Sequence, residues 1–568
     1  MTNFLEKARQ AFNDGTLDQA AQYTRYFLAQ NPDDPQGVHL LATIALIQKK
    51  PATTIALIGR ILPSLSDRDP ILAGRLYQTL GRALLMETHY EAARSAFVLS
   101  VTYFPEEAAA HAGLGEVFLQ MGKYEEAANA LSRAVRLASK EPVIWGLLGE
   151  AYAQAQQYEQ AASAYKQAIK FCPSETSFYA NLGAVLFHLS QWEDAKINLE
   201  KAVLLGNEKY ETFLSLALTL LSLGKILEAQ NIFENLLKKH PENLHIRLNI
   251  GSFYYEIGER HKAEEIFLSI EQKAPDSELA LQASFNRSAI LLEKGLWQEG
   301  WDCYEKRHFF TQSKVKSSLP LWDGAEGEGA VALSLEGGLG DSLTFLRFLP
   351  LAAKKRRLKL ECPAEFQTLL SFMPNLDLKN LASPKDKIVA RQSLNSLPYV
   401  LHINEAPSSE PYFNIPGEKE TDLIGLSWSG NPQYAFDKRR SLSLELLEPL
   451  KDIPHIRFLN LQREGECPAW MEKAPLHNIT DLARAVKRCA LIISIDSLVA
   501  NMAGAIGTPL WLLHRRGGDW RWKHHFWYQN VTLYESSSDE TSDQTRWFVA
   551  IEKIKEALWA WSRQGDRH

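Results

Sequence analysis

A glycine recurs at a fixed spacing in the first half of the chain. Gly115, Gly149 and Gly183 are 34 residues apart, Gly251 follows 68 residues later, and Ala217 fills the missing place between them. A period of this length is typical of chains built from one repeated supersecondary unit. Such a unit cannot bury its apolar face alone, so stacked units share a continuous core. The period therefore predicts a long solenoid.

Other positions keep the same register. A small residue stands twelve positions after each of these glycines and after Ala217, and a large apolar residue follows four positions later. The small residues are Ala127, Ala161, Ala195, Ala229 and Ala263, and the large ones are Leu131, Tyr165, Leu199, Phe233 and Phe267. Proline often closes the unit (Pro105, Pro173, Pro241, Pro275), because it cannot continue a helical hydrogen-bond ladder. This pattern resembles the tetratricopeptide repeat. We expect an α solenoid of about nine helix pairs over residues 1–310.

Three asparagines stand on the inner helices of these units. Asn181 and Asn249 lie two positions before the glycine, and Asn286 holds the corresponding place in a divergent last unit. Protein-modifying O-linked sugar transferases with repeats of this type hold extended peptides on an inner asparagine ladder. The resemblance implies the same acceptor-binding role here, since an amide can both donate to and accept from a peptide bond. Alternatively, these asparagines are solvated or satisfy a neighbouring carbonyl.

The helical period stops after Arg307, and short apolar runs then alternate with helical patterns. This alternation is typical of parallel sheets covered by helices. Two glycine-rich strand ends, near residues 337 and 429, favour two Rossmann-like lobes, at residues 311–415 and 416–568. Strands are predicted at 331–335, 358–361, 399–403, 423–428, 457–461, 491–495, 509–514 and 531–534, and helices at 341–353, 443–451, 480–489 and 498–506.

The stretch EGGLGDS follows the first predicted strand. Ligands of open α/β sheets bind at the carboxyl ends of strands. Gly337, Gly338 and Gly340 allow a ligand to approach the backbone closely. Asp341 could cap the next helix or act as a catalytic carboxylate at the floor of a cleft. The glycine spacing fits neither the nucleotide P-loop nor the dinucleotide fingerprint.

Four blocks occur in order: EGGLGDSLTFLRFLPL, WSGNPQYAFDKRRSLSL, DLARAVKRCALIISIDSLVANMAGAIGTPLWLL and GGDWRW. Together they resemble bacterial proteins that join tetratricopeptide repeats to a GT-B glycosyltransferase similar to the ADP-heptose heptosyltransferases. The resemblance implies an α solenoid followed by an α/β GT-B fold, whose final helix crosses back to the first lobe. Some members of this class resemble flagellin glycosyltransferases, which move a nonulosonic acid from a CMP donor to serine or threonine.

The resemblance also implies roles for single residues. Asp341 would be the base that deprotonates the acceptor hydroxyl, a task that one carboxylate can perform. The donor nucleotide sugar would contact Gly338, Gly340, Ser429, Asn431, Lys438, Arg439, Gln462, Asp496, Ser497, Asn501 and Trp520. Where Asn501 stands, heptosyltransferases have a histidine. A CMP sugar with one phosphate, or a weakened site, is compatible with that difference.

Several of these positions have plainer alternatives. The basic run at residues 438–440 could neutralise a phosphate leaving group or form a solvated face, and we favour a phosphate role for one of the three. Trp520 could stack on a base or sugar or wall the cleft. Asp496 could cap the helix in which Ser497 and the next amides would face a phosphate. Gln462 could be an ordinary loop residue.

Composition narrows the class of function. The formal net charge of -6 argues against a general nucleic-acid or anionic-membrane binder, and no window approaches the roughly 18 apolar residues of a membrane span. Five cysteines without a C-x-x-C pair predict reduced thiols and no zinc site. We expect a cytoplasmic protein O-glycosyltransferase that needs no metal or cofactor, with flagellin as the best acceptor guess. The alternatives are a catalytically weakened repeat scaffold and a transferase of lipopolysaccharide or other surface polysaccharide.

Overall fold

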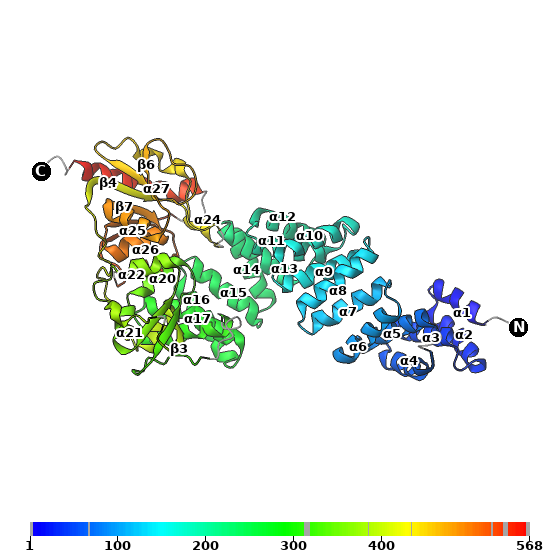
Figure 1. The fold of residues 1–568 in the computed structure, drawn as a ribbon. Helices are drawn as coiled ribbons and strands as arrows, with labels where there is room; N and C mark the ends of the chain where they lie inside the picture. Colours follow the sequence, from blue (N-terminus) through cyan, green and yellow to red (C-terminus); the bar gives the residue numbers. More distant parts are fainter. Residues whose placement is uncertain are drawn as a thin grey trace. The chain divides into compact units, whose positions relative to one another are not determined.

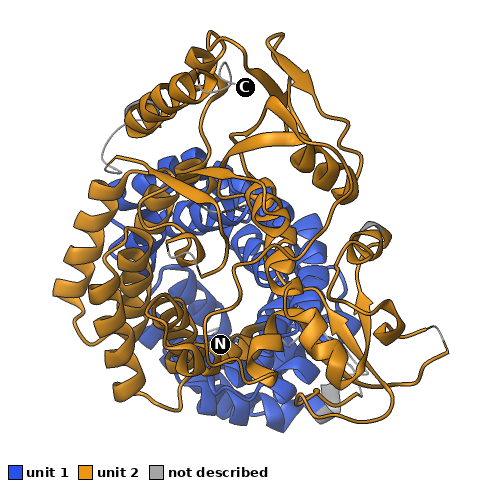
Figure 2. Ribbon diagram, turned by 90° about the vertical axis from the view of Figure 1, so that its left-hand side faces the viewer, with its two compact units in different colours: residues 1–216 blue, residues 217–568 orange. Residues whose placement is uncertain are grey.

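The computed structural model describes residues 4–65, 69–311, 319–383, 385–432, 434, 436–523, 526–537 and 543–563. The chain divides into two compact units, residues 1–216 and 217–568 (Figures 1 and 2). The division falls inside helix α13 (Tyr210–Ser222) and not at the predicted border at residue 310. The physical reason is that the last repeat helices pack against the sheets of the second unit.

The first unit is a stack of helices joined by short turns. It contains α1 (Phe4–Asn13), α2 (Leu17–Gln30), α3 (Pro35–Ile47), α4 (Pro51–Leu65), α5 (Pro70–Met86), α6 (Tyr90–Tyr103), α7 (Ala108–Gln120), α8 (Tyr124–Leu137), α9 (Pro142–Gln154), α10 (Tyr158–Phe171), α11 (Thr176–His188) and α12 (Trp192–Leu204). Each helix packs chiefly against the helices just before and after it. The predicted helical repeat is confirmed.

The pairing of α7 with α8 shows why the repeat needs its glycine. A Cβ added at Gly115 would lie 2.4 Å from Cγ of Leu131, and Leu131 is fully buried. The small residue therefore lets two helices approach around a large one. Pro173 lies two residues after the end of α10, as expected of a residue that stops the helix.

The second unit begins with further repeat helices. These are α14 (Ile226–Lys239), α15 (Leu244–Glu256), α16 (Arg260–Lys273), α17 (Glu278–Glu293) and α18 (Trp297–Tyr304), followed by η1 (Glu305–Arg307) and α19 (His308–Thr311). Among the helices that the structure describes, none combines the length and the hydropathy that crossing a membrane requires.

The described strands form two parallel sheets. The first has the order β2-β1-β3, with β1 (Ala330–Ser334), β2 (Arg357–Glu361) and β3 (Ile388–Ser393). The second has the order β6-β5-β4-β7-β8-β9, with β4 (Glu420–Ser427), β5 (Arg457–Asn460), β6 (Met471–Lys473), β7 (Cys489–Ile495), β8 (Leu510–His514) and β9 (Val531–Glu535). Every residue of β7 is buried, as expected of a strand covered on both faces. The predicted parallel sheets are confirmed.

Helices connect these strands. The α-helices are α20 (Leu339–Leu346), α21 (Leu349–Lys355), α22 (Ala364–Leu370), α23 (Leu397–Val400), α24 (Asp437–Arg440), α25 (Ile479–Arg488), α26 (Leu498–Ile506) and α27 (Asp543–Ser562). The 3₁₀ turns are η3 (Leu378–Asn380), η4 (Leu394–Ser396), η5 (Leu444–Leu446), η6 (Glu448–Leu450) and η7 (Trp520–Trp522).

Three local predictions are wrong. The expected strand at 399–403 overlaps α23, whose first turn contains Pro398, a residue whose fixed φ suits a helix start. The third strand of the first sheet is β3 instead. The helix predicted at 341–353 is interrupted between α20 and α21, and the one at 443–451 is two 3₁₀ turns, η5 and η6.

The final helix does not cross back to the first sheet. Trp547, Ile551 and Ile554 of α27 are buried in one cluster with Ile424 of β4 and Ile493 of β7. The apolar stripe of α27 is thus already covered by the six-stranded sheet, which leaves nothing to drive a crossing.

The two sheets share one apolar core. Helices α20 and α26 pack against each other, and so do α22 and α25. Leu333 of β1 and Ile492 of β7 belong to the same buried cluster, which also includes Leu292 and Trp301 of the repeat helices. The interlobe crevice that the resemblance implies is therefore closed along this seam.

Candidate functional site

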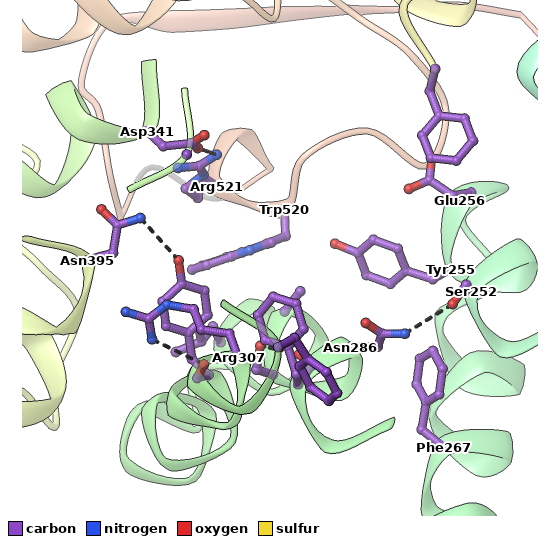
Figure 3. A pocket seen from close by; sticks show the side chains of 18 of the residues that line it. Ser252, Tyr255, Glu256, Phe267, Asn286, Arg307, Asp341, Asn395, Trp520 and Arg521 are labelled. Atoms are coloured by element: carbon purple, nitrogen blue, oxygen red, sulfur yellow. Dashed lines mark hydrogen bonds and ion pairs between the residues drawn. The ribbon is translucent and has the colours of Figure 1, made fainter. Parts of the chain in front are cut away.

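A cavity of about 500 Å³ lies in the second unit, beside the carboxyl ends of β1 and β8 (Figure 3). The repeat helices, chiefly α15, α17 and α18, supply most of its wall, and residues near the sheets, among them 336–341 and 520–521, supply much of the remainder. Ten of its 24 lining residues are aromatic. The cavity is thus mostly apolar, with a few polar groups at defined places.

Asp341 lines this cavity from the third position of α20. The preceding loop turns through Gly337, whose φ of +75° lies in the left-handed region that favours glycine. The Gly338 N–H donates to Asp341 Oδ2 over 3.3 Å, so the carboxylate caps its own helix. Its side chain is nevertheless 42% exposed. Capping and a cavity-facing carboxylate therefore coexist at this residue.

Arg521 connects Asp341 to the second sheet. Its Nη2 donates to Asp341 Oδ1 over 2.8 Å, and its Nε lies 3.0 Å from both carboxylate oxygens of Asp519. Burial alone would raise the pKa of Asp519, but the charge and hydrogen bonds of Arg521 outweigh burial and lower that pKa. A positive charge is thus held beside the Asp341 carboxylate. Sequence reasoning missed this partner, which is 180 residues away.

Trp520 also lines the cavity. Its ring centroid lies 6.4 Å from that of Trp297 in α18 and 5.7 Å from that of Trp527. Of the two roles left open by the sequence, these contacts favour a wall that joins the repeat helices to the second sheet.

Arg307 anchors the end of the repeats to the first sheet. The side chain is buried, and its Nε donates to Glu336 Oε1 over 3.0 Å. Its Nη2 donates to Ser396 Oγ over 2.7 Å. Ser393 Oγ donates to Glu336 Oε2 over 2.6 Å. These bonds hold α18 and η1 against the strand ends that form the cavity.

Arg439, predicted to contact the donor, binds a repeat helix in this structure. Its side chain is fully buried. Nη2 donates to the Glu256 carbonyl over 3.0 Å, and Nη1 lies 3.3 Å from Glu256 Oε2. Arg515 Nη2 donates to the same carboxylate over 2.7 Å. Because the repeat helix α15 supplies this carboxylate, Arg439 holds α15 on the second sheet. Lys438 and Asn431 are exposed.

Asn501 and Gly340, both predicted to contact the donor, lie at the seam between the sheets. Asn501 is buried, and its Oδ1 accepts from Thr344 Oγ1 over 2.9 Å and from the Tyr528 hydroxyl over 3.1 Å. Its Nδ2 donates to the Ser497 carbonyl over 3.0 Å. A Cβ at Gly340 would lie 3.1 Å from that Nδ2. Both residues therefore serve the contact of α20 with α26.

A second polar group lies at the carboxyl ends of β4 and β5. Ser427 Oγ donates to Gln462 Oε1 over 2.8 Å, and Gln462 Nε2 donates to the Ser429 carbonyl over 3.2 Å. A further hydrogen bond joins the Gln462 and Ser429 side chains. The structure thus brings together two of the predicted donor-binding residues.

Asp496 and Ser497 follow β7 at the start of α26. Trp522 Nε1 donates to Asp496 Oδ1 over 2.9 Å. Burial and the neighbouring Asp519 carboxylate raise the pKa of Asp496. Ser497 is the N-cap of α26, and its Oγ lies 3.5 Å from the Ala500 amide. The predicted start of a helix at Ser497 is therefore confirmed.

The three asparagines differ in their contacts. Asn286 lines the cavity, and its Nδ2 donates to Ser252 Oγ over 3.1 Å (Figure 3). Asn249 Nδ2 donates to the His245 carbonyl of its own helix over 2.8 Å, which matches the plainer alternative. Asn181 is exposed on α11 in the first unit. Only Asn286 therefore shares a cavity with Asp341 among the three.

Within the described part of the chain, no three His, Cys, Asp or Glu side chains are grouped as a metal ion would require.

Comparisons with known proteins identify the repeats. The family model described as "Cilia and flagella-associated protein 70 C-terminal domain" matches residues 65–238, and a tetratricopeptide repeat model matches residues 220–284. Protein FlbA of Caulobacter vibrioides is 24% identical over 313 residues, which cover 44% of this chain and 51% of that protein. The chain thus spans about half the length of this curated relative.

Solved structures with similar helices include pilF of Pseudomonas aeruginosa, with 20% identity and a TM-score of 0.32 over 36% of this chain and 94% of that one. The Cut9–Hcn1 complex has 18% identity and a TM-score of 0.35, over 49% and 54%. YrrB, a repeat protein with an unusual peptide-binding site, has 24% identity and a TM-score of 0.28, over 34% and 98%. The match to the tetratricopeptide repeat model shows such repeats in this chain, and a region of parallel sheets follows them.

Proposed function

We propose that this protein is an inverting O-glycosyltransferase that moves a sugar from a nucleotide donor to a serine or threonine of a protein. The observation that carries the proposal is the position of Asp341. Its half-exposed carboxylate faces a cavity whose wall is made largely by repeat helices. Repeats of this kind offer extended surfaces to polypeptides, so an acceptor held by them would meet this carboxylate.

The proposed reaction needs one general base. Asp341 takes the proton of the acceptor hydroxyl while that oxygen attacks the anomeric carbon, and the bond from this carbon to the nucleotide phosphate breaks on the opposite face. The proton ends on Asp341, and the phosphate leaves with the bonding electrons. Arg521 Nη2 donates to Asp341 Oδ1 over 2.8 Å and so fixes the orientation of the carboxylate. Positioned bases of this kind contribute about 10²–10⁴-fold to a rate.

The donor would lie at the strand ends of the six-stranded sheet. Ser429 and Gln462 are joined there, and Ser497 is the N-cap of helix α26; helix N-termini of this kind attract a phosphate. The resemblance of the four sequence blocks supports flagellin as acceptor and a CMP-linked nonulosonic acid as donor, and these are the first pair to test.

The test compares the purified protein with its Asp341→Asn variant. Each is mixed with flagellin and the CMP sugar, and the mass of intact flagellin is followed. We expect the variant to transfer about 10²–10⁴-fold more slowly. Asp422→Asn, which changes an exposed carboxylate of β4, is the matched control and should transfer normally. Equal rates for Asp341→Asn and the wild type would refute the role of Asp341 as base.

A second candidate is a repeat scaffold with weakened catalysis. It is favoured by the fact that Arg439 and Asn501, both expected to bind the donor, are occupied by protein contacts. This candidate predicts that cells producing only the Asp341→Asn protein keep the function of the wild type. Loss of function in such cells favours the enzyme.

A further inference from the structure

Much of the cavity wall has no part in the proposed proton transfer. Figure 3 shows Asp341 and Arg521 at one side of the cavity and Tyr255, Asn286 and Ser252 at the other. The mechanism uses only the first side. The second side is built by the repeat helices α15 and α17, the part of the second unit that would meet a polypeptide.

The aromatic side chains of the wall are held in place. Phe253 and Trp301 are buried. The guanidinium of Arg260 covers the Tyr255 ring, 3.8 Å from its centroid. Such a rigid aromatic surface binds another ring by offset or edge-to-face contact and gains from burying apolar area.

The aromatic zone of the wall, away from Asp341, offers a sugar few polar groups. Arg521 is paired with Asp341, Arg307 with Glu336, and Asn286 with Ser252. Sugar hydroxyls buried without partners lose their hydrogen bonds to water. An apolar side chain needs no such partners, so the aromatic zone suits it better.

Asn286 adds one contact suited to a peptide backbone. Its Nδ2 donates to Ser252 Oγ, and its amide oxygen is turned away from Ser252 toward the cavity (Figure 3). A backbone N–H is a fitting donor for this oxygen.

The size of the cavity limits how far apart in the acceptor sequence the bound side chain and the modified hydroxyl can be. A volume of about 500 Å³ corresponds to a sphere roughly 10 Å across, or about three residues of extended chain. A side chain in the aromatic zone and a hydroxyl at Asp341 would therefore belong to residues about three positions apart or closer.

We propose that this cavity is an acceptor subsite that binds an aromatic or large aliphatic side chain within about three residues of the modified serine or threonine. The assignment rests on the proposed function and adds the local sequence that the enzyme selects. Residues of α15 and α17 read the side chain, and Asn286 accepts from the backbone beside it.

The first test measures binding without turnover. Short fluorescein-labelled peptides carry one serine and, near it, either phenylalanine or alanine, and anisotropy is measured with the full-length Asp341→Asn protein. We expect the phenylalanine peptide to bind about tenfold more tightly or better, from the apolar area it buries. Equal affinities would overturn the proposal.

The second test fills the cavity. Ala289 of α17 lines the cavity and is half-buried, so Ala289→Phe places a ring where the peptide side chain would lie. We expect this variant to bind the phenylalanine and alanine peptides with about equal affinity. Gln282→Phe, on an exposed position of the same helix, is the control and should keep the preference. If thermal unfolding shows that Ala289→Phe does not fold, the first test, which compares the two peptides on the Asp341→Asn protein, decides whether the subsite exists.

Failure of this inference differs from failure of the proposed function. Sugar transfer at equal rates to both peptides would refute the subsite but support the transferase function. Selective binding of the phenylalanine peptide, with no transfer from the CMP sugar or from UDP, GDP or ADP sugars, leaves the subsite and removes the transferase.

Discussion

The repeats of the first unit and the sheet region of the second bury their apolar side chains in different ways. In the first unit, each buried cluster is confined to neighbouring helices, such as the one that joins α7 to α10 around Leu131. In the second unit, one cluster extends from Leu292 to Tyr528 and includes both sheets and the last repeat helices. Local clusters allow local opening, whereas a shared core couples distant elements.

This difference explains where the candidate site lies. A cavity between elements far apart in sequence keeps its shape only where those elements share a core. The cavity beside Asp341 takes its wall from repeat helices and from the loops of both sheets. The candidate site thus lies where the last repeat helices and both sheets share a core.

The largest expected effect comes from the shared core. Trp527 is 1% exposed, and its ring contacts those of Trp301 and Phe345. Trp527→Ala should lower the free energy of unfolding by about 3–5 kcal/mol. Hydrogen exchange followed by mass spectrometry should show faster exchange in both sheets and in α17.

The matched change in the repeats is Leu131→Ala, at a fully buried position. This change should lower the free energy of unfolding by about 2–5 kcal/mol. Faster hydrogen exchange should be confined to α7 through α10. If the faster hydrogen exchange spread through the whole unit in both variants, the contrast between local and shared cores would be wrong.

The next effect concerns the contact of α15 with the second sheet. Glu256 faces Arg439 and Arg515 with little exposure, so Glu256→Gln leaves two buried cations without their carboxylate. We expect a loss of about 3 kcal/mol and faster exchange at the end of α15. Glu259→Gln, at an exposed pair with Lys262, should cost below about 1 kcal/mol. Similar losses for both variants would mean that the buried pairs do not hold α15.

A smaller effect tests the glycine period. Gly115→Ala brings a Cβ against Leu131, and overpacking of this kind costs about 1–3 kcal/mol. Gly59 in α4 has no atom within 4 Å of the place a Cβ would take, so Gly59→Ala should stabilise by roughly 0.5–1 kcal/mol. Chemical unfolding of both variants gives the comparison, and a destabilised Gly59→Ala would show that packing is not the reason for the period.

The smallest effect is a pH dependence in the repeats. Burial, and then the charge of Arg75, lower the pKa of His39 to about 4 from its usual 6.5. The folded state thus favours neutral His39, so stability is full above pH 6.5 and falls as pH drops toward 4. We expect the free energy of unfolding, measured by thermal unfolding, to fall by about 1 kcal/mol by pH 6. The variant His39→Gln should lose this dependence, and an unchanged pH profile would assign it to other groups.

Local pattern was sufficient for much of the fold. The spacing of Gly115 and Leu131 predicts a helix pair because both residues act within one unit. The apolar run at 491–495 predicts β7, because a strand buried on both faces needs no distant information. Asp341 was found because a glycine-rich strand end is itself a local feature.

The contacts of the site could not be found in this way. Arg439 and Asn501 stand in motifs that resemble donor-binding blocks, yet the structure gives their hydrogen bonds to Glu256 and Thr344. Each polar group satisfies whichever partner folding places nearest, and in these cases that partner is far away in sequence.

The sequence by itself determined the repeat period, the alternation of strands with helices, and an aspartate after the first strand. Only the tertiary structure decided that this aspartate shares a cavity with repeat helices and an ion pair with Arg521. The physical reason is range: periodicity and turn chemistry act between neighbours along the chain, whereas a cavity and its charges depend on which distant surfaces pack together.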